Sequence, residues 1–120
     1  MKKSVNVLGT KYTIKMVKIS ECDLLRNINW CGSCYEMIKE ILIGDPSEEE
    51  YFGKLSKEEK TETINQILRH EITHAFFNES GLSASANTFE GSWAKNEELI
   101  DWIAIQFPKM QKAFEEAGCL

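Results

Sequence analysis

The 120-residue sequence has little proline and no surplus of positive charge. With only two prolines and 42% hydrophobic residues, its composition is that of a globular chain and excludes a disordered or fibrous protein. The 19 acidic residues outnumber the 14 basic ones, so no excess of cations is present to neutralise a nucleic-acid backbone. We therefore expect a single domain over residues 1–120, with no nucleic-acid partner.

Long apolar runs are also missing. No stretch approaches the roughly 20 apolar residues that span a membrane, and residues 1–16 lack the apolar run of a signal peptide. We therefore expect a cytoplasmic protein with no membrane partner. In that compartment the four cysteines are expected to be thiols: Cys22, Cys31, Cys34 and Cys119.

The first 46 residues carry the signals of a small sheet. Apolar and polar residues alternate from Val5 to Ile19, with a turn near Gly9, which predicts a pair of strands. The segment from Trp30 to Pro46 predicts a second hairpin, and the polar connection between the two has room for a helical turn. We expect a twisted sheet of three or four strands.

A long helix is predicted after the sheet. Ser56 and Glu59 form the S-x-x-E pattern of a capping box, which marks its start. Apolar residues then recur at spacings of three and four until about Asn78, and Gly81 is suited to end the helix. This helix is expected to pack one apolar face on the sheet, which gives an α+β fold.

A second helix is predicted after a loop of small residues at 83–92. It is expected to run from about Ala94 to Phe107 and to end at Pro108, because proline lacks the N–H that a helix interior requires. A short amphipathic tail should follow it. Together the two helices carry the most informative residues of the chain.

Both histidines of the chain lie in HEITH, residues 70–74. Positions four apart share a face of a helix, so His70 and His74 can direct ring nitrogens at one ion. Catalytic zinc takes three protein ligands and leaves a position for water, toward which Glu71 is expected to act as general base. The alternative is that two surface histidines lie four apart by chance, since the pattern is short.

A third ligand decides between these readings. The chain has no third histidine, so a carboxylate must serve, and Glu97 and Asp101 lie four apart on the second predicted helix. Glu97 is suited to complete a Zn²⁺ site, and Asp101 to accept a hydrogen bond from a ligating histidine and fix its tautomer. Alone these acids indicate a solvated charged face; with HEITH they favour a metal site.

The motifs resemble those of zincin metallopeptidases in which a glutamate is the third ligand, the gluzincin-like arrangement. The order of an N-terminal strand pair, the WCGSCY hairpin, a capped helix ending LRHEITHAFFNESG and the segment NEELID is similar to small phage and mobile-element peptidases of the ImmA/IrrE type. The resemblance implies a zincin-like α+β fold and a protein or peptide substrate, such as a phage regulatory protein. It implies these roles: zinc ligands His70, His74 and Glu97, catalytic base Glu71, and orienting carboxylate Asp101.

The sequence departs from the resemblance in one respect. It has no further histidine to stabilise a transition state, and Tyr35, Tyr51 and Arg69 are not assigned to that role. A zinc-binding regulatory module without turnover is therefore an alternative to a peptidase.

Residues 30–34, WCGSC, provide a different candidate active site. They resemble the thioredoxin motif, in which a helix N-terminus lowers the pKa of a thiol. The preceding residues ECDLLRNIN are too polar for the buried strand that thioredoxins place there, and neither proline suits a loop beside the thiols. A thiol–disulfide oxidoreductase is the third alternative.

Two further expectations concern the exclusion of water from the site and the binding of the substrate. Phe76, Phe77 and Trp102 are predicted on the inner faces of the two helices, where they would exclude water from the site. An extended substrate is expected to add to the sheet edge at residues 32–37.

Overall fold

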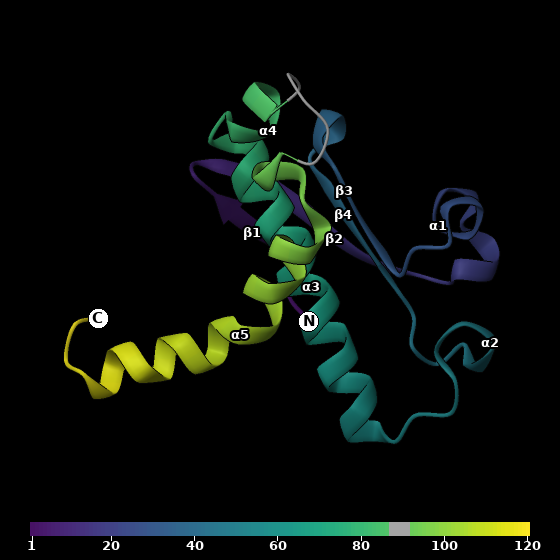
Figure 1. Cartoon of the computed structure of the whole chain (residues 1–120). Coiled ribbons are helices and arrows are strands. Elements are labelled where there is room, and N and C mark those ends of the chain that lie inside the picture. The colour runs from purple at the N-terminus through teal and green to yellow at the C-terminus, as the bar shows by residue number, and fades with distance from the viewer. Residues whose placement is uncertain (87–91) are drawn as a thin grey trace.

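A computed structural model describes residues 1–86 and 92–120, and Figure 1 shows its α+β architecture, as predicted. A four-stranded mixed sheet packs against one long helix, and a second long helix packs against the first. The strands are β1 (Ser4–Val7), β2 (Thr10–Val17), β3 (Gly32–Tyr35) and β4 (Glu40–Gly44). The helices are α1 (Asp23–Ile28), α2 (Glu49–Phe52), α3 (Lys57–Glu79), α4 (Leu82–Ser85) and α5 (Glu97–Glu116), with short 3-10 turns η1 (Ile19–Glu21), η2 (Glu36–Ile38) and η4 (Trp93–Lys95).

The sheet has the order β1-β2-β4-β3, so β3 is an outer strand. Both predicted hairpins are present: β1 pairs antiparallel with β2, and β3 pairs antiparallel with β4. The first turns at Leu8 and Gly9, whose φ angles of 50° and 91° match the mirror-image turns that tight hairpins prefer. The two hairpins join through a parallel pairing of β2 with β4.

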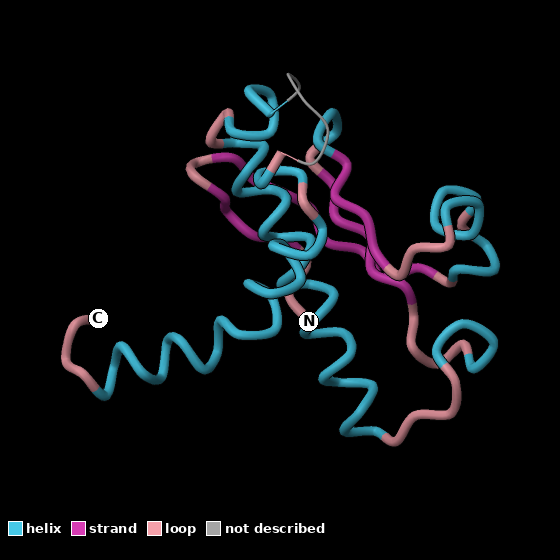
Figure 2. The backbone as a smooth tube through the Cα atoms, viewed as in Figure 1, coloured by secondary structure: helices cyan, strands magenta, loops and turns pink. Residues whose placement is uncertain are grey.

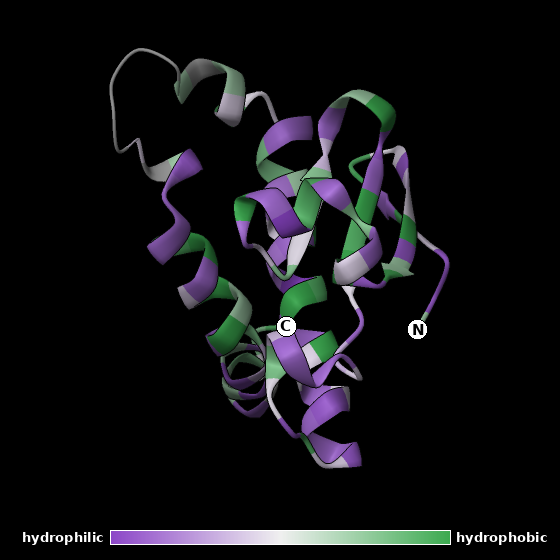
Figure 3. Ribbon diagram, turned by 90° about the vertical axis from the view of Figure 1, so that its right-hand side faces the viewer, coloured by the Kyte–Doolittle hydropathy of each residue, from purple (hydrophilic) through white to green (hydrophobic). Residues whose placement is uncertain are grey.

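The strands bury alternate residues on opposite faces, as the period of two requires. Ile41 and Ile43 of β4 lie in the core beneath α3, whereas Leu42 packs with Ile19 and Leu25 in a cluster on the other face. Figure 3 shows hydrophobic and hydrophilic residues alternating along the strands. The α3 face of the core consists of Val7, Tyr12, Ile14, Ile41, Ile43 and Ala75, with Ile64, Ile67, Leu68 and Ile72 packed against them.

Helix α3 begins and ends close to where the sequence predicts. The Ser56 hydroxyl accepts a hydrogen bond from the Glu59 amide, and the Glu59 carboxylate accepts one from the Ser56 amide, which completes the capping box. At the other end Gly81 adopts a φ of 81°, a left-handed conformation that favours glycine. The 23 residues between place HEITH in the C-terminal half of the helix.

The prediction that Pro108 ends the second long helix is wrong. Helix α5 runs from Glu97 to Glu116 with Pro108 inside it. Pro108 has no N–H to donate to the Ala104 carbonyl, but the Arg69 Nε of α3 donates to that oxygen at 2.6 Å. A tertiary contact thus satisfies the group that proline leaves open. Figure 2 shows the second half of α5 changing direction and running away from the rest of the molecule.

Part of the predicted loop at 83–92 is helical, because α4 occupies Leu82–Ser85. The stretch 87–91 of that loop lies outside the described residues. Within the described chain, no helix combines the length and hydrophobicity needed to cross a membrane.

Candidate metal centre

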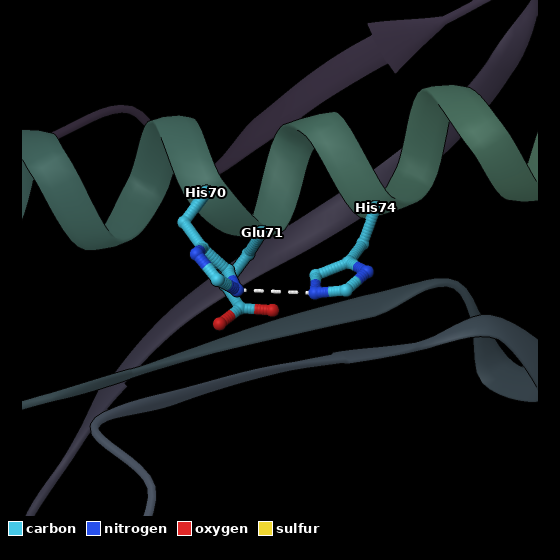
Figure 4. Close-up of side chains that lie close together, drawn as sticks. All are labelled: His70, Glu71 and His74. Carbon is cyan, nitrogen blue, oxygen red and sulfur yellow. Dashed lines mark hydrogen bonds between the residues drawn. The ribbon is translucent and has the colours of Figure 1, made fainter. Parts of the chain in front are cut away.

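Three chemically active side chains project from one stretch of α3. His70, Glu71 and His74 each offer one ligand atom, and these atoms lie within 4.8 Å of one another. Figure 4 shows all three side chains on the side of the helix that faces the sheet, with the two rings pointing toward each other. The Nε2 atoms of His70 and His74 are 3.0 Å apart, so the spacing of four places both nitrogens at one point.

Helix α5 brings a carboxylate, that of Glu97, to the same point. The Asn96 side chain accepts a hydrogen bond from the Leu99 amide at 3.0 Å at the start of the helix. Glu97, the first helical residue, places Oε2 at 3.0 Å from Nε2 of His70 and Oε1 at 3.4 Å from Nε2 of His74. The structure therefore brings together the three residues that the sequence predicts as ligands.

Asp101 lies one turn further along α5, behind the first histidine. Its Oδ1 is 2.7 Å from Nδ1 of His70. An ionised carboxylate only accepts hydrogen bonds, so this contact favours a proton on Nδ1, and in the neutral ring the lone pair is then on Nε2, the nitrogen that faces Glu97. Asp101 thus occupies the orienting position that the sequence predicts for it.

The donor set fits a divalent cation such as zinc. Ligands at about 2.0–2.1 Å in a tetrahedral arrangement are about 3.3 Å apart. The separations among His70 Nε2, His74 Nε2 and the Glu97 carboxylate are 3.0, 3.0 and 3.4 Å. Lone pairs this close repel one another unless a proton or a cation lies between them. Two imidazoles and one carboxylate are also ligand types that zinc takes in catalytic sites.

His74 is held in the form that binds metals. Its burial lowers its pKa and favours the neutral ring, although the nearby Glu97 carboxylate opposes this effect. A neutral imidazole offers the lone pair that a metal requires.

Glu71 is the most unusual carboxyl group of the site. It is 5% exposed, and burial, followed by the charge of Glu97, raises its pKa to about 8. A hydrogen bond from the Cys34 backbone N–H opposes that rise and ties the carboxylate to β3. A cation at the adjacent ligands would favour the ionised form.

The glycine of WCGSC has a packing role that sequence reasoning missed. A Cβ atom on Gly32 would lie 2.6 Å from Cγ2 of Ile67 and 2.7 Å from Oε1 of Glu71. Helix α3 therefore approaches β3 so closely that only glycine fits. An isolated glycine within a predicted strand is the signal that indicates such a contact.

A cavity of about 360 Å³ opens at the candidate site. Besides the five site residues, its described lining includes Asn29, Trp30, Gln66 and Ile67, but no lysine or arginine. A neighbouring hollow of about 300 Å³ shares Trp30 and extends to Cys34 and Asn78. The two hollows share Glu71, His74 and Glu97, so the candidate site lies between them.

The aromatic residues expected to exclude water do not do so. Phe76 and Trp102 are 44% and 52% exposed, and Phe77 is half-buried.

Two of the residues left without a role in transition-state stabilisation make other contacts. Tyr51 packs in the cluster on the other face of the sheet. Arg69 contacts the Ala104 carbonyl and, at 2.9 Å, Glu62.

The cysteines of WCGSC lie in an environment unlike that of a redox-active pair. Both are free thiols, and Cys34 lies in β3 rather than at a helix N-terminus. Burial, followed by the charge of Glu71, raises the pKa of Cys34 to about 12, and burial also raises the pKa of Cys31. In an extended chain residues three apart are about 10 Å apart, beyond the roughly 7 Å that a disulfide bridges.

The five predicted site residues thus line one cavity, where α3, α5 and β3 converge. Asn29 and Gln66 join them in the cavity lining; Gln66 precedes His70 by four residues, so the helical period could have indicated it. Comparisons of the chain with protein-family models, curated proteins and solved structures gave no match.

Proposed function

We propose that the chain is a zinc-dependent metallopeptidase of zincin-like architecture that hydrolyses peptide bonds in a protein substrate. The observation that carries the proposal is the convergence of Glu97 with the two histidines. Its carboxylate oxygens lie 3.0 and 3.4 Å from their Nε2 atoms, although Glu97 belongs to a different helix. A solvated charged face would have no reason to meet both rings.

The proposed ligands are His70, His74 and Glu97. Bound zinc would supply a Lewis acid that polarises the scissile carbonyl and acidifies water. Asp101 holds the proton of His70 on Nδ1, so that the other nitrogen faces the ligand point. Loss of such an orienting partner typically weakens metal binding about 10–100-fold.

Glu71 is the proposed general base. Its carboxylate lies beside the ligand atoms and is anchored to β3 by the Cys34 N–H. It accepts a proton from water and passes it to the leaving amine.

The outer strand β3 is the proposed docking edge for an extended substrate. Of the segment that the sequence suggests, residues 32–37, only the first four belong to the strand; Glu36 and Met37 lie in η2, where Met37 is 87% exposed. Trp30, 54% exposed, adds apolar surface at the cavity, and Tyr35, 45% exposed, adds it on the strand. These side chains suit a substrate that presents apolar residues along an extended backbone.

The test combines metal analysis with substitution. Protein purified without added zinc should contain one equivalent of metal, and Glu97→Gln should lose it. Glu98→Gln is the matched control, because Glu98 is the exposed neighbour of Glu97. Glu71→Gln should retain the metal and lose cleavage of a quenched fluorescent peptide library by at least about 100-fold.

The alternatives predict different results. A regulatory zinc-binding module would contain metal but would cleave no peptide in the wild-type form. A thiol–disulfide oxidoreductase would contain no stoichiometric metal, and its reduction of a dithiol probe would depend on Cys31 and not on Glu71. Metal loss in both Glu97→Gln and Glu98→Gln would contradict the proposed ligand set.

A further inference from the structure

Pro108 leaves one carbonyl of α5 without its helical donor. In a regular helix the amide of residue 108 would bond to the oxygen of Ala104, but proline has no N–H. Ala104 is 1% exposed, so water has little access to the residue. A buried carbonyl needs a partner, and Arg69 Nε provides it at 2.6 Å.

This contact lies on the same stripe of α5 as the candidate site. Glu97, Asp101, Ala104 and Pro108 follow one another at spacings of four, three and four, which places them on one face of the helix. On α3, Arg69 is the residue directly before His70. The Arg69–Ala104 contact is therefore an extension of the interface that holds the ligands.

The contact differs in kind from those that join Glu97 of α5 to the two histidines of α3. The contacts of Glu97 with the two histidines bring lone pairs together, so they need a proton or a cation to be favourable. The Arg69–Ala104 bond joins a permanent cation to a neutral carbonyl and is favourable by itself. It can hold the two helices together before any metal arrives.

We propose that Arg69 is a positioning residue of the metal site. By donating to the Ala104 carbonyl, which lacks a helical donor because residue 108 is proline, it holds α5 against α3. In this arrangement Glu97 and Asp101 reach the histidines. The inference rests on the metal site of the proposed function, but it makes a claim about the metal-free protein as well. There, too, Arg69 keeps Asp101 within hydrogen-bonding distance of His70.

The variant Arg69→Met tests this claim. Methionine retains a long apolar stem but has no donor for the Ala104 oxygen. The matched control is Glu62→Gln, which removes the other partner of the guanidinium and leaves the Ala104 contact in place. Circular dichroism first establishes that each variant is folded.

Two measurements follow, and one needs no metal. In the metal-free protein, the Nδ1 proton of His70, observed by ¹⁵N NMR, should exchange at least about tenfold faster in Arg69→Met and at the wild-type rate in Glu62→Gln. Zinc affinity, measured by competition with a chelator, should fall about 10–100-fold in Arg69→Met only. Wild-type exchange and affinity in Arg69→Met, or equal losses in Glu62→Gln, would overturn the inference.

A second variant covers the case in which Arg69→Met does not fold. Pro108→Ala supplies an N–H for the Ala104 oxygen and straightens the helix. Arg69 then no longer reaches that oxygen. The unfolding temperature should rise, because alanine replaces proline in a helix interior, while zinc affinity falls. A purely structural role would move both quantities in the same direction, and an unchanged affinity would contradict the proposal.

The outcomes separate this inference from the proposed function. If the wild-type protein binds no zinc, the peptidase proposal fails, yet the proton exchange of His70 in the metal-free variants still decides the role of Arg69. If the protein binds zinc and cleaves peptides but Arg69→Met behaves as the wild type, only the present inference fails.

Discussion

Two glutamates on α3, eight residues apart, have opposite environments. Glu71 is 5% exposed, and its pKa is raised to about 8 by burial and by the charge of Glu97. Glu79 accepts hydrogen bonds from Lys39 Nζ at 2.6 Å, Tyr12 OH at 2.7 Å and Thr10 Oγ1 at 2.9 Å. These donors, with Lys39 first, lower its pKa to about 2.

The difference shows that the partners of a carboxylate, not its helix, decide its role. Lys39, which also lies over the Tyr12 ring at 5.6 Å, provides a cation that keeps Glu79 charged. The pKa of Glu71 is lowered by one backbone donor, that of Cys34, and raised by burial and by the charges of Glu97 and Asp101. Glu79 anchors the end of α3 to the sheet, whereas Glu71 is suited to exchange a proton.

Shortening each glutamate is expected to give the largest contrast. Glu71→Asp withdraws the carboxylate by about one methylene, and a misplacement of about 1 Å can cost about 100-fold in rate. Cleavage of the quenched peptide library should fall about 100-fold, with zinc content unchanged. Glu79→Asp should retain the wild-type rate. Equal losses of activity in the two variants would remove the proposed distinction.

A methyl group added at Gly32 should have the second-largest effect, because it would disturb the packing around Glu71. The added Cβ would meet Ile67 and Glu71 at 2.6 and 2.7 Å, so Gly32→Ala should lower the free energy of unfolding by about 1–3 kcal/mol. Urea denaturation measures the change, with Ser33→Ala as a control on the same strand that adds no atom. A Gly32→Ala protein as stable as the wild type would show that α3 and β3 are not in close contact.

Neutralising Glu79 should reduce stability in a pH-dependent way. The folded pKa of about 2 lies below the unfolded value of about 4.3, so the ionised group stabilises the fold above pH 4.3 and the effect is lost as the pH falls toward 2. Glu79→Gln should therefore have a lower urea midpoint than the wild type at pH 7, and the two should converge near pH 2. Glu50→Gln, at an exposed position, should show no such pattern.

The smallest expected effect concerns Cys34. Its pKa of about 12 is raised in part by the charge of Glu71, so alkylation by iodoacetamide should be slow at pH 9. In a Cys31→Ser background, Glu71→Gln should accelerate this reaction modestly and Glu79→Gln should not. Mass spectrometry after timed quenching gives the rates. Equal rates in the two variants would argue that Glu71 does not act on the thiol.

The sequence predicts the parts of the fold that depend on local patterns. The capping box at Ser56, the apolar periodicity of α3 and the alternation in the strands all act over a few residues, and the structure bears them out. The pairing of β2 with β4 is different, because two predicted hairpins could join along several edges. The position of β3 at the edge depends on that long-range choice.

The candidate site follows the same division. The helical spacings correctly indicate that His70 and His74 share a face, and that Glu97 and Asp101 do so too. That the histidine pair lies close to the carboxylate pair is a hypothesis that local patterns alone do not establish. The continuation of α5 past Pro108 could not be predicted, because the group that compensates for proline comes from another helix.

The order of the ligands along the chain has a consequence for synthesis on the ribosome. Both histidines and Glu71 emerge together on α3, but Glu97 follows 23 positions after His74, on a helix that must still form and dock. A nascent chain therefore carries only two of the three proposed ligands until α5 is complete. Under the proposed function, hydrolytic chemistry would begin only after α5 has formed and docked on α3.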